Sequence, residues 1–223
     1  MIEVKDLSKA YHGNEVLNIP NLMIPKGESF GLVGNNGAGK TTFFRLILDL
    51  IRASTGAVFI QGDNVMGSVE WKRFTGSYLD EGFLIDFLTP EEYFDFLADI
   101  NGLSKGDVKE FYDTFAEFFN NEVLGKKKFI RELSSGNQKK VGIAAALMTK
   151  PELLILDEPF NSLDPTTQIR LKTLLKKIQE DRNITALISS HDLNHVTEVC
   201  ERIVVLETGS IVQDIKTTAT TLK

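Results

Sequence analysis

The densest group of residues that could do chemistry lies at positions 34–42, which read Gly-Asn-Asn-Gly-Ala-Gly-Lys-Thr-Thr. The spacing fits the pattern G-x-x-x-x-G-K-[ST], in which backbone N–H groups at a helix start approach phosphate oxygens that a Cβ would obstruct. Lys40 would contact the β- and γ-phosphates of ATP, the Thr41 hydroxyl would be a ligand of Mg²⁺, and Thr42 would bond a phosphate oxygen. The predicted nucleotide contacts are Gly34, Asn35, Asn36, Gly37, Ala38, Gly39, Lys40, Thr41 and Thr42. The alternative, a glycine-rich turn before an ordinary helix, would match by chance in about one of a hundred chains of this length.

A pair of carboxylates follows an apolar run further along the chain. Residues 153–156 are all apolar, which is typical of a strand covered on both faces, and Asp157 and Glu158 come directly after them. Phosphoryl transfer to water requires an acidic group that holds Mg²⁺ opposite the phosphate loop. We assign Asp157 to the metal and Glu158 to the attacking water, a catalytic role worth about 10²–10⁴-fold in rate. A structural ion pair is the alternative for each carboxylate.

The elements around the phosphate loop can be read from apolar periodicity. Residues 29–33 predict a short buried strand before the loop, and apolar residues recur at helical spacing over 43–51 after it. Residues 2–22 predict two antiparallel strands joined by a turn at 12–14. Tyr11 lies beside that turn, where it either packs locally or stacks on adenine.

The elements after the carboxylate pair continue a βαβ alternation. A helix is predicted to about residue 181, a strand at 184–188 and a further helix through Cys200. Residues 202–214 predict a hairpin, and the Thr-rich tail from Lys216 is expected to fray. Such alternation predicts a parallel sheet with its functional residues at the carboxyl ends of the strands.

The middle of the chain predicts a helical insertion. Thr89 and Glu92 form a capping box with Pro90 at the first helical position, and Ser104 and Ser134 are natural N-caps of later helices. The helices between are rich in aromatic residues at helical spacing. These aromatics either form a core of their own or contribute to a docking surface.

Composition limits the class of protein. The chain has 223 residues, 42% hydrophobic and 25% charged residues, and a formal net charge of −6, values typical of a folded protein with room for a subdomain. The negative charge disfavours bulk binding of nucleic acid, and the lysine run at 126–128 predicts a solvated surface. The single cysteine, Cys200, excludes an internal disulfide. The apolar run at 141–148 is much shorter than the roughly 20 residues of a membrane-spanning helix, so we expect a soluble chain.

Several motifs occur in one order over nearly the whole chain, and together they resemble the nucleotide-binding subunit of ATP-binding cassette (ABC) transporters. Residues 34–42 resemble its Walker A loop, and residues 153–158 resemble its Walker B strand with the glutamate that follows. Residues 133–137, Leu-Ser-Ser-Gly-Asn, resemble the family signature LSGGQ. Residues 162–164 resemble its D-loop, and His191 its switch histidine.

The resemblance implies an α/β fold: a phosphate-loop NTPase core of mainly parallel sheet, with an antiparallel β subdomain and an inserted helical subdomain. The core would comprise residues 1–88 and 151–223, and the helical subdomain with the signature would comprise residues 89–150.

The resemblance also implies roles for residues outside the phosphate loop. Tyr11 would stack on adenine, and His191 would be catalytic by stabilising the γ-phosphate and the transition state. His195, one helical turn further on, is expected to be a structural surface residue. In the family two cassettes pair head to tail, so Ser134 and Gly136 at the signature helix start would bind the partner's ATP.

The implied partners are ATP with Mg²⁺, a second cassette that forms a homodimer on ATP binding, and a separate transmembrane subunit, with no nucleic acid. The chain would be an ATP hydrolase, cytoplasmic and peripheral on the cytoplasmic face of the membrane. Its compact length resembles subunits that serve drug, peptide or antibiotic exporters. One rival is a soluble ABC ATPase acting on ribosomes or nucleic acid, and another is a nucleotide sensor that does not hydrolyse ATP.

The sequence departs from the family pattern at two places. Ser135 replaces a Gly and Asn137 replaces the last Gln of the signature, which we expect to tune the site without abolishing it. Asp80 stands where the family has a Gln that contacts Mg²⁺, and we hypothesise that Asp80 is a metal ligand once ATP is bound. Phe83 and Phe87 follow in an apolar stretch, and either line the groove that accepts a helix of the membrane subunit or pack inside the helical subdomain.

Overall fold

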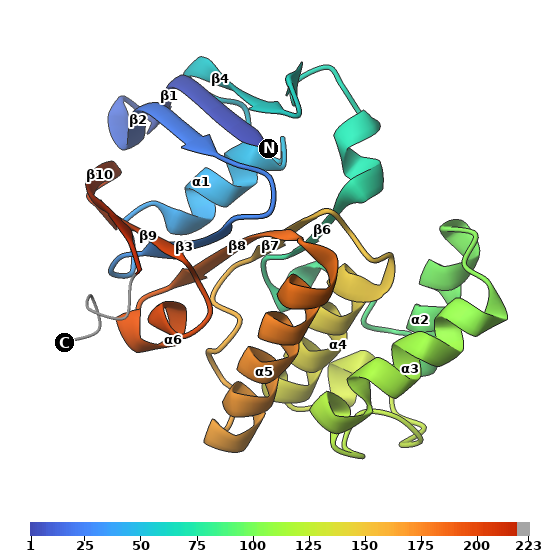
Figure 1. The fold of residues 1–223 in the computed structure, drawn as a ribbon. Helices are drawn as coiled ribbons and strands as arrows, with labels where there is room; N and C mark the ends of the chain where they lie inside the picture. Colours follow the sequence, from blue (N-terminus) through green and yellow to red (C-terminus); the bar gives the residue numbers. More distant parts are fainter. Residues whose placement is uncertain (218–223) are drawn as a thin grey trace.

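A computed structural model describes residues 1–217 of the chain (Figure 1). Within them, ten strands form one mixed sheet in the order β5-β4-β1-β2-β10-β9-β3-β8-β7-β6. The strands are β1 (Ile2–Tyr11), β2 (Asn14–Ile24), β3 (Ser29–Val33), β4 (Thr55–Ile60), β5 (Asp63–Asn64), β6 (Thr75–Tyr78), β7 (Leu153–Leu156), β8 (Thr185–Ser190), β9 (Arg202–Glu207) and β10 (Ser210–Lys216). Strands β5, β4, β1 and β2 pair antiparallel, whereas β9, β3, β8, β7 and β6 run parallel.

The parallel strands end at one edge of the sheet. Val33 of β3 lies opposite Ser190 of β8, and Tyr78 of β6 lies opposite Leu156 of β7. All residues of β3, β7 and β8 are buried, as expected for strands covered on both faces. The residues that follow these strands therefore come together at the edge where α/β sheets carry their sites.

The helices of the described residues are α1 (Lys40–Ile47), α2 (Pro90–Ile100), α3 (Lys105–Phe119), α4 (Ser135–Met148), α5 (Pro165–Arg182) and α6 (Leu193–Thr197). Turns of 3₁₀-helix span Glu70–Phe74, Glu81–Phe83 and Ile130–Glu132. The predicted N-caps Thr89, Ser104 and Ser134 each accept a hydrogen bond from the backbone N–H three residues on. Thr89 and Ser104 complete capping boxes with Glu92 and Asp107, so these helix starts are fixed by local sequence.

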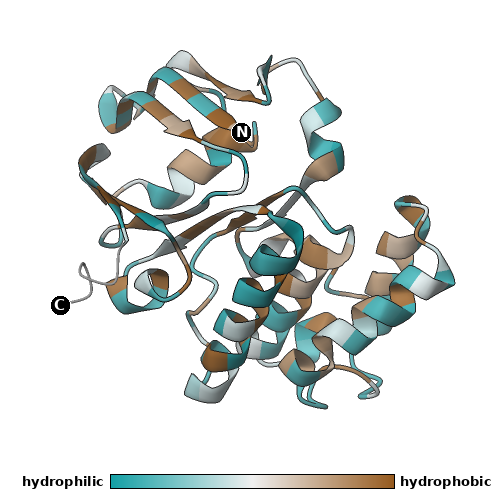
Figure 2. Ribbon diagram, viewed as in Figure 1, coloured by the Kyte–Doolittle hydropathy of each residue, from teal (hydrophilic) through white to brown (hydrophobic). Residues whose placement is uncertain are grey.

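Two buried clusters lie on opposite faces of the parallel strands. Helix α1 packs between the antiparallel strands and one face of the parallel strands (Figure 1). Helices α4, α5 and α6 cover the other face of the parallel strands. Strand β7 shows the alternation: Leu153 and Ile155 belong to the α1 cluster, and Leu154 and Leu156 to the other. Apolar colour runs through the middle of the sheet, whereas α5 presents a mostly hydrophilic side (Figure 2).

The aromatic residues of the helical insertion extend the cluster beneath the sheet. Phe94 of α2 is fully buried, with its ring centroid 4.9 Å from that of Phe111 of α3. Both belong to the same continuous cluster as Leu154 of β7 and Leu171 of α5. The α/β fold with antiparallel strands and inserted helices is confirmed, while the subdomain boundaries at residues 88 and 150 stay a prediction.

Three predicted boundaries differ from the structure. Helix α1 ends at Ile47 because Asp49 turns the chain with φ 51°, so the apolar residues up to 51 do not continue it. Helix α6 ends at Thr197, well before Cys200, whose N–H still bonds the Val196 carbonyl at 2.8 Å. The tail was expected to fray from Lys216, but strand β10 includes Lys216, and Thr217 N–H donates to the Glu201 carbonyl at 2.7 Å. The remaining positions, 218–223, lie outside the described residues.

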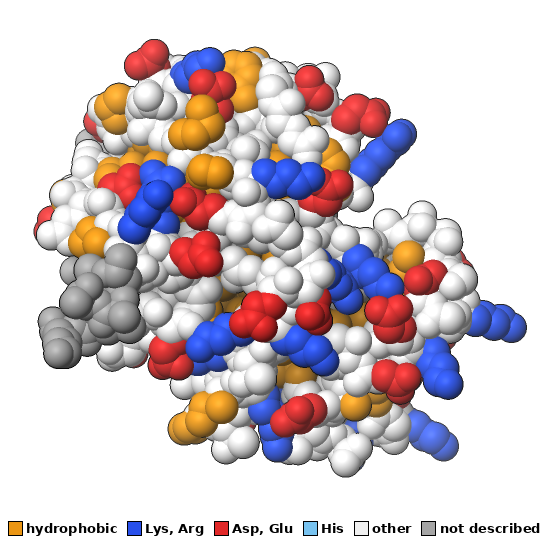
Figure 3. Space-filling view, in the orientation of Figure 1, with side chains coloured by type: hydrophobic (Ala, Val, Ile, Leu, Met, Phe, Trp, Pro, Cys, Tyr) orange, Lys and Arg blue, Asp and Glu red, His pale blue; other side chains and the backbone are white. Residues whose placement is uncertain are grey.

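Acidic and basic side chains are interleaved over the face drawn in Figure 3, and no broad basic patch covers it. This distribution fits the negative formal charge of the chain.

Candidate active site

The phosphate loop runs from the end of β3 into α1, and two of its glycines, Gly34 and Gly39, lie close to the backbone of β9 and β2. Gly39 is the N-cap of α1 with φ 107°, a conformation that L side chains rarely adopt. A Cβ on Gly34 would lie 2.4 Å from the carbonyl oxygen of Leu206 in β9. The tight packing against β9 and β2 therefore leaves room only for glycine, and the loop's amides stay open at the start of α1.

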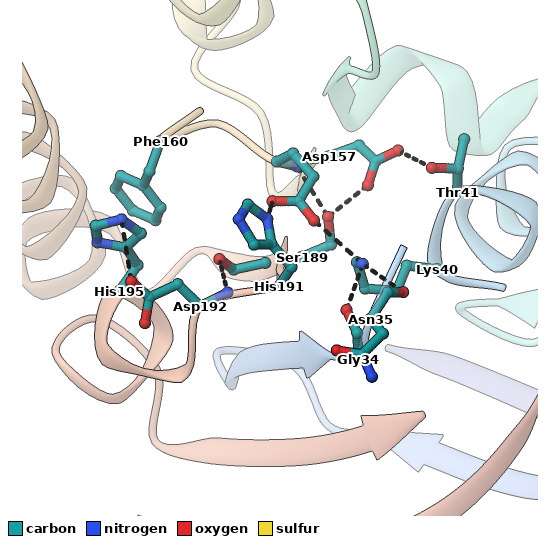
Figure 4. Close-up of polar contacts among 12 residues, drawn as sticks. Gly34, Asn35, Lys40, Thr41, Asp157, Phe160, Ser189, His191, Asp192 and His195 are labelled. Carbon is teal, nitrogen blue, oxygen red and sulfur yellow. Dashed lines mark hydrogen bonds and ion pairs between the residues drawn. The ribbon is translucent and has the colours of Figure 1, made fainter. Parts of the chain in front are cut away.

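Lys40 points back over its own loop, where it is only 6% exposed. Its Nζ donates to the Gly34 carbonyl at 2.6 Å and lies 3.1 Å from Glu158 Oε1 (Figure 4). The Lys40 amine, in the first turn of α1, and the Glu158 carboxylate, after β7, thus face each other at the edge of the sheet.

Asp157 is the buried acid of the site. Its Oδ2 accepts a hydrogen bond of 2.5 Å from Thr41 Oγ1, and its Oδ1 accepts one from Ser189 Oγ. Burial raises the pKa of Asp157, and these two hydrogen bonds oppose that rise. A cation beside this carboxylate would offset its desolvation.

The donor set around Asp157 fits Mg²⁺. The Asp157 carboxylate and the Thr41 hydroxyl supply hard oxygen ligands. The described part of the chain contains no group of three or more His, Cys, Asp or Glu side chains that could hold a metal ion by themselves. Mg²⁺ is usually held by one or two carboxylates while phosphate and water oxygens complete its shell, which matches this sparse set.

Glu158 adopts φ 46°, in the left-handed region that non-glycine residues seldom occupy. Its Oε2 lies 3.0 Å from His191 Nδ1, and its backbone N–H donates to Ser189 Oγ at 2.8 Å. Its buried Oε1, although close to Lys40, accepts no hydrogen bond from the described residues. A buried carboxylate oxygen with spare acceptor capacity is suited to bind a water molecule.

A hollow of about 440 Å³ opens above the loop, lined by residues 33–38, His191 and residues 205–208. The hollow is bounded by the loop amides on one side and by the end of β9 on the other. It offers a space beside the phosphate loop and His191 that is large enough for a phosphorylated ligand.

Two predicted site residues, Tyr11 and Asp80, have other contacts than those of this centre. Tyr11, at the end of β1, is 43% exposed and has the Lys9 amine 4.7 Å from its ring centroid. Asp80 follows β6 at the same sheet edge, but its carboxylate lies 3.7 Å from Arg45 Nη2 and accepts a hydrogen bond from Gly82 N–H. Their roles toward adenine and metal stay predictions.

The signature residues lie at the start of α4. The Ser134 hydroxyl caps the helix by accepting from Asn137 N–H at 3.3 Å. A Cβ on Gly136 would lie 2.9 Å from the Ser162 carbonyl oxygen, so glycine permits close contact with the segment that resembles a D-loop. The contribution of Ser134 and Gly136 to a partner's nucleotide stays a prediction.

The expectation for His195 was wrong in part, because its side chain is only 17% exposed. Its ring stacks on Phe160 with centroids 4.9 Å apart (Figure 4). Burial, with the nearby Lys172 amine, lowers the pKa of His195. The short helix α6, which begins after its N-cap Asp192, places this ring against Phe160. The spacing of residues along the sequence could not reveal this orientation.

Two polar residues that contact Asp157 or the Glu158 backbone were not predicted from the sequence. Ser189 at the end of β8 bonds both Asp157 and the Glu158 backbone, and Lys139 of α4 donates to the Glu158 carbonyl at 3.0 Å. The only available signal was a serine at the end of an apolar strand and a lysine entering an apolar helix.

The glycine loop at the start of α1, its buried lysine and the acidic end of β7 define a phosphate-loop ATPase fold. A family model described as ABC transporter matches residues 17–161. The chain belongs to the ABC transporter family.

Individual relatives agree with this membership. The chain is 35% identical to the bacitracin transport ATP-binding protein BcrA of Enterococcus faecalis, over 96% of this chain and 69% of that protein. It is 31% identical to the methionine import ATP-binding protein MetN 1 of Burkholderia pseudomallei (strain 1710b), over 96% of this chain and 64% of that protein. A solved dimeric structure of the ATP-binding cassette MJ0796 in a post-hydrolysis state with ADP and Pi matches with a TM-score of 0.82 and 27% identity, over 97% of this chain and 98% of that chain.

The chain is therefore an ATP hydrolase of the ABC type and an ATP-binding subunit of a transporter. Among the described residues, no helix combines the length and apolar character that crossing a bilayer requires.

Proposed function

We propose that this chain binds ATP with Mg²⁺ and couples closure of a cassette dimer, followed by ATP hydrolysis, to substrate movement by a separate membrane subunit. The observation that carries the proposal is the convergence of Lys40, Thr41, Asp157, Glu158 and His191 at one sheet edge. In this arrangement the chain would act on the cytoplasmic face of the membrane, bound there through its partner.

Each residue at this edge has a chemical role in the proposal. Thr41 and Asp157 would hold Mg²⁺, which when bound neutralises charge on the phosphoryl group being transferred. Glu158 would orient the attacking water and accept its proton, and Lys40 would leave the Glu158 carboxylate to bind the β- and γ-phosphates. His191, which bonds Glu158 Oε2, would hold that carboxylate and the γ-phosphate in a common geometry.

The dimer is proposed to be head to tail. Ser134 and Gly136 lie at the N-terminal end of α4, where helix amides favour an anion. The dimeric MJ0796 cassette supports pairing of cassettes of this fold. A homodimer would contain two sites, each built from one chain's phosphate loop and the other chain's signature.

The direction of transport is proposed from the relatives. BcrA is a bacitracin transport ATP-binding protein, and on this likeness we favour export of an antibiotic-like compound. The methionine import relative keeps import as the second candidate.

We expect Asp80→Ala to raise the Mg²⁺ concentration for half-maximal ATP turnover, by up to about 10-fold. Asp80 follows β6 at the sheet edge where Thr41 and Asp157 would hold Mg²⁺. Its carboxylate would break its ion pair with Arg45 and coordinate Mg²⁺ directly or through water. A magnesium titration of turnover measures the effect. Asp86→Ala, an exposed acid on the same loop, serves as the control. If Asp80→Ala keeps the wild-type Mg²⁺ dependence, Asp80 does not act at the metal.

The surface for the membrane subunit is proposed to include a hollow of about 480 Å³, away from the phosphate loop. It is lined in part by Leu50, Trp71, Phe83, Leu84, Tyr93 and Leu97. Phe83 lines it while 58% exposed, and Phe87, 61% exposed, lies outside its lining. Neither side chain is buried in the helical subdomain, and the aromatic lining is suited to an amphipathic helix.

Phe83→Ala should weaken contact with the membrane subunit and change the free energy of unfolding by less than about 1 kcal/mol, because the side chain is exposed. Truncating the fully buried Phe94 to Ala should instead lower the free energy of unfolding by about 3–5 kcal/mol. A photo-crosslinking residue at position 83 tests the contact in intact membranes, with position 129, where Phe129 is 40% exposed, as the control. An integral membrane protein crosslinked only from position 83 supports the proposal. Equal crosslinking from both positions, or loss of several kcal/mol in Phe83→Ala, contradicts it.

A further inference from the structure

Glu158 carries out its proposed role from an uncommon backbone conformation, and two side chains from different elements hold its peptide groups. Its φ of 46° is sparsely populated for L-residues, so the surrounding contacts must maintain it. Ser189 Oγ accepts from its N–H at 2.8 Å, and Lys139 Nζ donates to its carbonyl oxygen at 3.0 Å. The Asn161 N–H donates to the same carbonyl over 3.3 Å.

Lys139 is buried, at 6% exposure, in the second turn of α4. Its amine lies 5.9 Å from the ring centroid of Tyr78 on β6. A Cβ on Gly142, one turn later, would lie 2.3 Å from the Tyr78 ring, so α4 rests directly on β6. The lysine therefore reaches Glu158 from a fixed position, and a hydrogen bond from a charged donor is stronger than a neutral one.

The same helix carries the signature at its start. Ser134 caps α4, and Gly136 touches the Ser162 carbonyl in the segment after Glu158. Any displacement of α4 that accompanies occupation of its N-terminus would move the Lys139 amine relative to the Glu158 carbonyl. A single helix thus links the predicted contact with the partner's nucleotide to the backbone of the predicted catalytic acid.

We infer that Lys139 is a positioning residue for hydrolysis: it holds the Glu158 peptide so that the carboxylate faces the attacking water, and it transmits the position of the signature helix to that acid. The inference rests on the proposed function of Glu158. If Lys139 has this role, turnover depends on its amine and nucleotide affinity does not.

The test compares Lys139→Met with Lys139→Arg, which restores a charged donor. Lys139→Met should lower kcat by about 10- to 100-fold, since small misplacements of catalytic groups cost up to about 10²-fold, while KM and ATP affinity stay within about twofold. Lys139→Arg should recover most of the kcat. Lys140→Met is the matched control, because Lys140 is adjacent, 2% exposed and paired with Glu122 at 2.6 Å. Its kcat should stay near wild type in the folded fraction.

A double-mutant cycle separates this inference from the function on which it rests. If Lys139 acts through Glu158, adding Lys139→Met to Glu158→Gln should lower turnover no further. Multiplicative losses in the double variant, equal kcat losses in Lys139→Met and Lys140→Met, or unchanged kcat in Lys139→Met would overturn the inference. Should Lys139→Met fail to fold, Lys139→Ala, which likewise has no side-chain donor, replaces it in the same cycle. If Glu158→Gln itself keeps wild-type turnover, the proposed function fails first.

Discussion

Replacing Glu158 by Gln is expected to lower ATP turnover by about 10²–10⁴-fold while ATP affinity in the presence of Mg²⁺ stays near that of the wild type. The amide keeps the shape of the side chain and removes the carboxylate that would accept the proton of the attacking water. It leaves Lys40, Thr41 and Asp157, the proposed phosphate and metal contacts, unchanged. Steady-state phosphate release and calorimetric titration with a slowly hydrolysed ATP analogue measure the two quantities.

Glu152→Gln is the matched control for this variant. Glu152 lies just before β7, at the opposite end of that strand from Glu158, and pairs with Lys26 at 2.6 Å on the surface. Its turnover should stay within about twofold of wild type, since exposed ion pairs contribute little. Wild-type turnover in Glu158→Gln would remove Glu158 from the catalytic role.

Lys40→Ala is expected to weaken ATP binding by about 10- to 100-fold, because hydrogen bonds to charged groups contribute about 1.5–3 kcal/mol. The lysine is the buried cation of the phosphate loop and would have the β- and γ-phosphates as partners. Calorimetric titration with ATP measures the affinity directly. Turnover should fall with it, because less of the enzyme carries nucleotide.

The control for Lys40→Ala is Lys176→Ala on the exposed side of α5, which removes the same charge far from the loop. Its ATP affinity should match that of the wild type. If Lys40→Ala binds ATP as tightly as the control does, the lysine does not contact phosphate and the loop assignment is wrong. Circular dichroism of both variants shows whether folding is retained.

Features encoded in short stretches of sequence could be predicted. The N-caps at Thr89, Ser104 and Ser134 depend on residues within one turn, so local chemistry sets them. The strand before Asp157 could be read from its unbroken apolar run. The contact between Thr41 and Asp157 was expected because parallel strands bring their carboxyl ends to one edge.

Features that depend on contacts between distant segments could not be predicted. Lys139 donates to the Glu158 carbonyl although the two residues are 19 positions apart in the sequence. The apolar periodicity of the sequence gives no information about that contact. Asp80 pairs with Arg45 of α1, a partner that can be found only from the packing of β6. His195 lies under Phe160, because the short α6 turns its ring toward the segment after β7.

ATP binding is proposed to close two copies of this chain around composite sites, and sedimentation of the Glu158→Gln variant measures that closure. The variant should retain ATP, so the closed state should persist long enough to observe. We expect a monomer without nucleotide and a dimer with ATP and Mg²⁺. Gly136→Glu, placed in the same variant, should abolish the dimer because it puts an acid against the partner's phosphates. A Glu158→Gln chain that stays monomeric while calorimetry shows ATP bound to it would rule out closure driven by ATP.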